Sequence, residues 1–181
     1  MNLNEKCSKK GFTMIELLVV IAIISLLSSI VWVAVDSARS KTRDTRRVVD
    51  INQLRTALEL YYDANKQYPL STGATSPNSS WSNSNDSSWE TLGNNMSAYM
   101  AKLPVDPKQS SSGWPGGGRF SYAYFSVAQS GCLNQQWYLI VYKLENASGP
   151  DIGVMSCDGL RLWQFGGSDA NTAIKTVGVS R

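Results

Sequence analysis

The chain has 181 residues, a formal net charge of +3 and no histidine. This length suits one small domain with one anchor, and so small a net charge points to no particular class of partner. The absence of histidine excludes a serine–histidine triad, and three cysteines without a Cys-x-x-Cys pair argue against a zinc site.

The first segments of the chain differ sharply in polarity. Residues 1–11 are short and basic, and residues 12–35 are almost entirely apolar. As a helix, residues 12–35 would be about 36 Å long, enough to cross a bilayer core of about 30 Å. The single charge in this apolar segment is Glu16. Such a carboxylate is costly in lipid, so it either reaches the membrane surface or is paired with a charge on another chain.

The sequence Gly-Phe-Thr-Met-Ile-Glu at residues 11–16, ahead of this apolar run, resembles the processing site of type IV prepilins and type II secretion pseudopilins. The resemblance implies that a prepilin peptidase cuts between Gly11 and Phe12 and that the new Phe12 amine is methylated. It also implies that Glu16 pairs with the terminal amine of a neighbouring subunit. An uncleaved signal anchor is the alternative for this segment.

Charges beside the apolar segment give two conflicting predictions of orientation. Lys6, Lys9 and Lys10 precede it, and a longer basic run over residues 39–47 follows it. The positive-inside rule does not favour a cytoplasmic N-terminus, whereas processing requires one. We expect a cytoplasmic N-terminus and a head outside. We interpret the basic run as a solvated helix surface near anionic headgroups rather than as a nucleic-acid site.

Residues 36–66 are predicted to continue the helix. No proline or glycine interrupts residues 12–66, and apolar residues recur at helical spacing, at Val48, Ile51, Leu54 and Leu58. The result would be one helix of roughly 50 residues, about 80 Å long. We expect its second half to be amphipathic and to pack against residues 67–181, which would form a globular head.

The head begins with a polar segment. Residues 71–88 are rich in serine and asparagine and are expected to form a flexible exposed loop, with Trp81 as a packing anchor. Residues 89–100 are predicted to form a short helix. Leu-Pro-Val-Asp-Pro at residues 103–107 resembles a segment of Gram-positive-type pilins and major pseudopilins.

Strands are predicted over about residues 120–165. The candidates are residues 120–127, 137–144, 152–157 and 160–165, the last two joined by a turn at Asp158-Gly159. Residues after 166 are expected to be loose. The predicted fold class is α+β: a long N-terminal helix packed on one face of a small antiparallel sheet of three to four strands.

The head contains two cysteines and few candidate metal ligands. Cys132 and Cys157 would either form a disulfide, worth about 3 kcal/mol, or remain as buried thiols. The third cysteine, Cys7, would be removed with the leader. No cofactor is expected, although the resemblance to major pseudopilins implies that calcium is an option. Its candidate ligands are aspartates in turns, which could equally be solvated: Asp106, Asp151 and Asp158.

The predicted function is that of a structural subunit of a type IV pilus-like filament, not an enzyme. The alternatives are a type II secretion pseudopilin and a minor pilin or tethered module for DNA uptake or adhesion. Expected partners are related subunits, the prepilin peptidase, an assembly platform with its ATPase, and membrane lipid before assembly; nucleic acid is not expected. The predicted location is the cytoplasmic membrane, followed by a surface or periplasmic filament.

Overall fold

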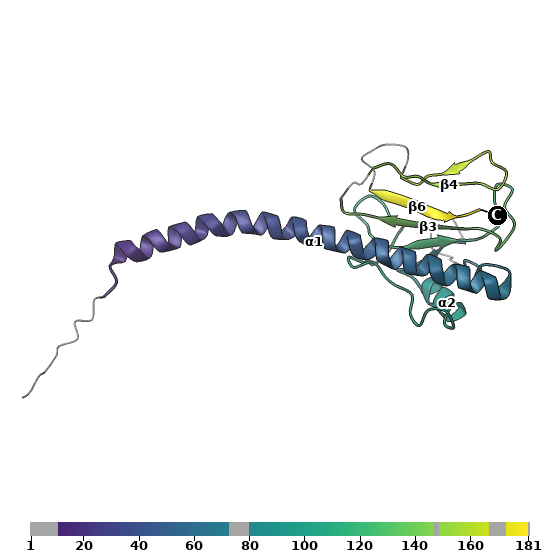
Figure 1. Ribbon diagram of the computed structural model, residues 1–181, viewed down its shortest axis with the longest axis horizontal. Helices are drawn as coiled ribbons and strands as arrows, with labels where there is room; N and C mark the ends of the chain where they lie inside the picture. Colours follow the sequence, from purple (N-terminus) through teal and green to yellow (C-terminus); the bar gives the residue numbers. More distant parts are fainter. Residues whose placement is uncertain (1–10, 73–79, 147–148, 167–172, 181) are drawn as a thin grey trace, which may run out of the picture. The chain divides into compact units, whose positions relative to one another are not determined.

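The computed structural model describes residues 11–72, 80–146, 149–166 and 173–180 (Figure 1). The lysines of the leader, Cys7, and residues 73–79 of the serine-rich segment lie outside this part of the chain. The chain divides into two compact units, Met1–Arg39 and Ser40–Arg181.

Helix α1 runs over Met14–Asn65 and confirms the prediction of one long uninterrupted helix (Figure 1). Its start is fixed by a capping box: the Thr13 hydroxyl accepts from the Glu16 N–H at 3.3 Å, and the Glu16 carboxylate accepts from the Thr13 N–H at 2.9 Å. Its end is marked by Lys66, which adopts a left-handed φ of 56°.

The first unit contains the apolar part of α1. Among the described residues, α1 is the one helix long and apolar enough to cross a membrane, with an 18-residue window of mean hydropathy 2.8 that is not buried at all. Its large apolar side chains are exposed along the segment, from Met14 to Val35. This unit therefore offers an apolar surface that the described residues do not cover.

The second unit is a head built on an antiparallel sheet. Four strands lie in the order β1-β2-β3-β6, and a separate pair, β4-β5, forms a hairpin. The elements are β1 Ser82–Asn83, α2 Ser87–Asn95, β2 Ala123–Phe125, β3 Tyr138–Lys143, β4 Val154–Met155, β5 Leu162–Trp163 and β6 Ile174–Val179. The predicted α+β class and the hairpin around Asp158-Gly159 are confirmed.

Two sequence-based predictions for the head are wrong. Residues after 166 were expected to be loose, yet β6 pairs with β3 along its whole length, from Ile174 opposite Lys143 to Val179 opposite Tyr138. Residues 71–88 were expected to be a flexible loop, yet β1 pairs with β2 and Asp86 caps α2. Trp81 is buried, as predicted for a packing anchor.

The sheet is covered on both faces, whereas only one buried face was predicted. Alternate residues of β3, including Tyr138 and Ile140, pack against the α1 side chains Ile51, Leu54 and Leu58. The residues between them pack in a second cluster with Trp81, Phe125, Trp137, Val154 and Trp163. The unbroken apolar run of β3 is the pattern of a strand buried on both faces.

Candidate functional site: the processing segment and the head charge cluster

The predicted processing segment lies open at the start of α1. Gly11 and Phe12 precede the helix, and the Phe12 side chain is 86% exposed. A Cβ atom added at Gly11 would meet no atom within 4 Å. The fold therefore makes no demand for glycine at this position, and any requirement for it comes from outside the chain.

Glu16 has a partner that sequence reasoning missed. Its Oε2 atom accepts from the Thr13 N–H at 2.9 Å and from the Thr13 hydroxyl at 2.7 Å. The Thr-x-x-Glu spacing of a capping box was the available signal. This box holds the carboxylate beside Phe12, which would carry the new terminal amine after cleavage. This geometry within one chain does not test the predicted pairing of Glu16 with a neighbouring subunit, which stays a prediction.

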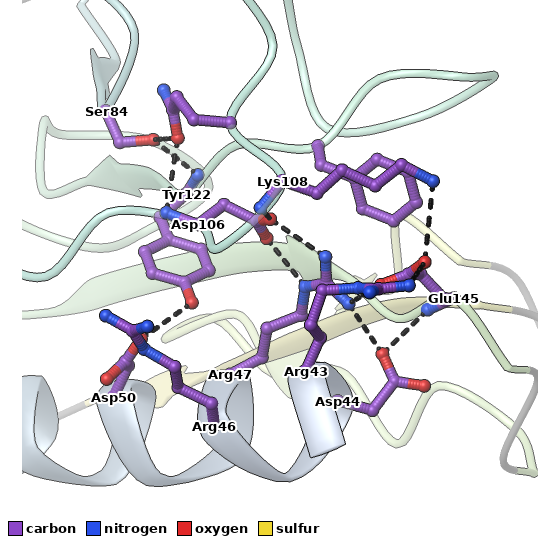
Figure 2. Close-up of polar contacts among 12 residues, drawn as sticks. Arg43, Asp44, Arg46, Arg47, Asp50, Ser84, Asp106, Lys108, Tyr122 and Glu145 are labelled. Atoms are coloured by element: carbon purple, nitrogen blue, oxygen red, sulfur yellow. Dashed lines mark hydrogen bonds and ion pairs between the residues drawn. The ribbon is translucent and has the colours of Figure 1, made fainter. Parts of the chain in front are cut away.

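A group of ionised side chains ties α1 to the rest of the head (Figure 2). We call it the head charge cluster; its members are Arg43, Asp44, Arg47, Asp106, Lys108 and Glu145. At its centre Arg47, whose side chain is 0% exposed, forms a two-bond fork with Asp106 at 2.7 and 2.8 Å. The remaining Arg47 nitrogen bonds Asp44 at 2.7 Å and Glu145 at 2.9 Å. Burial of this guanidinium is thus offset by three carboxylates.

Glu145 is the second centre of the head charge cluster. Arg43 donates to its two oxygens at 2.6 and 2.7 Å, and Lys108 lies 3.4 Å away. The two hydrogen bonds from Arg43, followed by the one from Arg47, lower the pKa of Glu145 to about 2. The carboxylate therefore stays ionised in the folded head well below neutral pH.

The head charge cluster corrects the interpretation of residues 39–47 as a solvated basic surface for Arg43 and Arg47 only, since Arg39, Lys41 and Arg46 are exposed as predicted. Arg47 lies on the buried stripe four residues before Ile51, whereas Val48, predicted for that stripe, is 41% exposed. The Arg47 guanidinium also lies 4.7 Å from the centre of the Phe120 ring. The helical spacing to Ile51 was the signal; what was missing was the partner, Asp106, 59 residues further along the chain.

The aspartates proposed as calcium ligands do not converge. Asp106 binds Arg47, Asp151 accepts from the Thr176 N–H at 2.6 Å, and Asp158 accepts from the Leu160 N–H at 3.0 Å in its own turn. Within the described residues, no group of three or more histidine, cysteine, aspartate or glutamate side chains is placed to hold a metal ion.

The two head cysteines are joined in the structure. Cys132 and Cys157 form a disulfide with a Cα–Cα distance of 4.9 Å. Cys132 closes a turn with Gln129, and Cys157 lies in the turn between β4 and β5. The disulfide therefore ties the β2–β3 connection to the β4-β5 hairpin.

Comparison with known proteins agrees with these features. Residues 6–32 match the family model of the prokaryotic N-terminal methylation motif. The chain is similar to type II secretion system core protein G of Pseudomonas aeruginosa, with 31% identity over 108 residues that cover 57% of this chain and 70% of the relative. It is also similar to core protein G of Aeromonas hydrophila, with 29% identity over 103 residues and the same two coverages.

A second kind of relative matches over a shorter stretch. A fimbrial protein of Pseudomonas aeruginosa is 40% identical over 52 residues, which cover 29% of this chain and 34% of the relative. No solved structure matches the chain. The methylation motif, the exposed apolar helix and the match to core protein G over most of that relative's length lead to one assignment. The chain belongs to the type IV pilin and type II secretion pseudopilin family.

Proposed function

We propose that the chain is a structural subunit of a type IV pilus-like filament, cleaved after Gly11 and polymerised through its apolar N-terminal helix. The observation that carries this proposal is the union of a methylation motif with an apolar surface from Met14 to Val35 that the described chain leaves uncovered. Such a surface is stable only against lipid or against other apolar helices.

The same surface explains how a membrane protein becomes a filament subunit. Lipid tails and neighbouring helices are similarly apolar, so exchanging one for the other costs little hydrophobic free energy. A charge pair is then well suited to fix the position of one subunit along the next. Glu16 on one chain and the methylated Phe12 amine on another would form that pair in a medium of low dielectric constant.

The proposal includes specific partners and an orientation. A prepilin peptidase would act on the cytoplasmic side, and an assembly platform with its ATPase would extract the processed chain from the cytoplasmic membrane. The head would lie outside, where an oxidising compartment would preserve the Cys132–Cys157 disulfide. No catalytic role is proposed, since the carboxylates of the head charge cluster are paired with arginines.

A second candidate is the pseudopilin of a type II secretion system. The fimbrial match spans 52 residues, whereas the match to core protein G of Pseudomonas aeruginosa spans 108 residues. The longer match exceeds the first unit, Met1–Arg39, by far and so must include much of the second unit. This longer match favours a head of the pseudopilin type. A minor pilin that binds DNA is less well supported, because Trp81 and Trp137 pack in the core rather than forming a stacking surface.

The proposal is tested by the intact mass and N-terminal sequence of the protein from membrane and sheared surface fractions of its native cell. A chain that starts at methylated Phe12 is expected in both fractions for a pilus. A processed chain that is absent from the surface, together with failed protein secretion on gene deletion, would establish the pseudopilin instead. A protein that retains Met1 would overturn both candidates.

A further inference from the structure

The edge strand β6 carries a lysine at a buried position. Lys175 is 9% exposed and lies opposite Tyr142 in the register of β3 and β6. An ammonium group at such a position needs hydrogen-bond acceptors to replace the water it has lost. The acceptors that surround Lys175 therefore indicate its structural role.

The Lys175 ammonium is held by backbone carbonyls of one short segment. It donates to the carbonyl oxygens of Gly149 and of Pro150, the second at 3.2 Å. Gly149, whose carbonyl is the first of the two acceptors, has a φ of 77°, in the left-handed region that favours glycine. Two main-chain oxygens of one segment thus face a single positive charge.

The next residue, Asp151, locks the same segment to β6. Asp151 is 1% exposed. Its carboxylate accepts hydrogen bonds from the Thr176 N–H and hydroxyl, both at 2.6 Å. The N–H groups of Gly166 and Gly153 also donate to it, at 3.0 and 3.3 Å. Four donors from this chain therefore already surround the carboxylate, and its negative charge attracts the neighbouring Lys175.

This arrangement does not fit the calcium that the resemblance to major pseudopilins implied. Calcium binds six to eight oxygens, at about 2.3–2.6 Å. Here the carbonyl oxygens of residues 149 and 150 face an ammonium, and the Asp151 oxygens accept hydrogen bonds from the chain. A fixed positive charge among these oxygens also repels a divalent cation.

We propose that the Lys175 ammonium is the cation that fastens residues 149–151 to β6, and that the head folds independently of calcium. The lysine supplies from within the chain the positive charge that a bound metal would otherwise bring to this segment. This inference concerns the head alone and does not depend on the kind of filament.

The first test is thermal unfolding of the full chain in detergent, with millimolar calcium and with excess EGTA. We expect the same midpoint, to within about 1 °C, in both. A ligand at a hundred-fold excess over its Kd would raise the midpoint by roughly 5 °C or more in a chain of this size. A rise of that kind with calcium would overturn the inference, and this test requires no variant.

The second test replaces the ammonium with an apolar group of similar length. Lys175→Met leaves two carbonyl oxygens without their donor, so we expect the midpoint to fall by roughly 3–10 °C. Lys102→Met, at an exposed position, is the matched control and should leave the midpoint unchanged. Equal midpoints for the two variants would show that Lys175 does not fasten the segment.

Discussion

The two halves of α1 satisfy their side chains in opposite ways. Up to Val35 the apolar side chains are exposed, and polar groups bond within the helix, as Ser25 does to the Ile21 carbonyl at 2.7 Å. From Ser40 onward the helix depends on distant residues: Arg43 reaches Glu145, 102 positions away, and Leu54 and Leu58 are fully buried. One continuous helix thus carries a surface for other molecules and a surface for its own head.

This difference separates two kinds of consequence. Changing the first half is expected to alter what the chain can assemble with, because its apolar side chains are exposed, whereas both core clusters and the head charge cluster lie within Ser40–Arg181. Changing the second half removes partners from buried charges and destabilises the head.

The largest effect is expected at Gly11, on the assembly side. Gly11→Phe should abolish processing if the proposed peptidase requires glycine at this position, because the fold itself has open space there. Intact mass would show a chain that retains its leader. Met14→Leu, just beyond the cut, is the control and should be processed normally. A normal mature mass for Gly11→Phe would contradict the proposal that a prepilin peptidase cleaves after Gly11.

Glu16 tests assembly after processing. Glu16→Ala should be inserted and cleaved but should form no filaments, because the terminal amine of the neighbouring chain would lack its partner. Thr13→Ala is the matched control: it loses the two capping bonds of the Thr13 hydroxyl, at a cost of about 1 kcal/mol, but keeps the carboxylate. Electron microscopy of sheared fractions would count filaments. Normal filament numbers from Glu16→Ala would exclude this residue from the mechanism.

Arg47 tests the head side. Arg47→Met leaves Asp106 buried without its cation, and the free energy of unfolding should fall by about 3–5 kcal/mol. Arg46→Met changes a neighbour whose side chain is 66% exposed and 3.9 Å from Asp50, so it should cost less than about 1 kcal/mol. Urea unfolding of both variants measures the difference. Similar losses would mean that burial of the Arg47 pair is not what stabilises the head.

The smallest effect is a dependence of head stability on acid. The pKa of Glu145 is lowered in the folded head to about 2 from an ordinary 4.5, so its stabilisation is present above the ordinary value and is lost as pH falls toward 2. The loss should reach at most roughly 3 kcal/mol over this range. Glu145→Gln should flatten the dependence measured by urea unfolding. An unchanged slope in that variant would assign the acid sensitivity to other carboxylates.

The sequence predicted the features that depend on neighbouring residues. The methylation motif, the uninterrupted helix and the hairpin at Asp158-Gly159 are each encoded within a few consecutive turns or positions. The aromatic and β-branched run at residues 137–144 likewise predicted β3 correctly. Local signals of this kind need no knowledge of distant partners.

The features that were missed depend on pairs of residues far apart in the chain. β6 contains a lysine and a glycine that weaken its strand pattern, and both are explained by contacts made only in the fold. Lys175 binds the carbonyls of residues 149 and 150, and a Cβ on Gly178 would lie 2.1 Å from the Tyr138 carbonyl oxygen. The burial of Arg47 likewise becomes intelligible only with Asp106 beside it.

The fork between Arg47 and Asp106 also has a mechanical consequence. Together with the Arg43 bonds to Glu145, it connects one turn of α1 to two separate segments of the head. A pulling force on the helix would be shared among these bonds. We therefore expect the mechanical strength of the subunit to depend on the rate at which the head charge cluster opens under load.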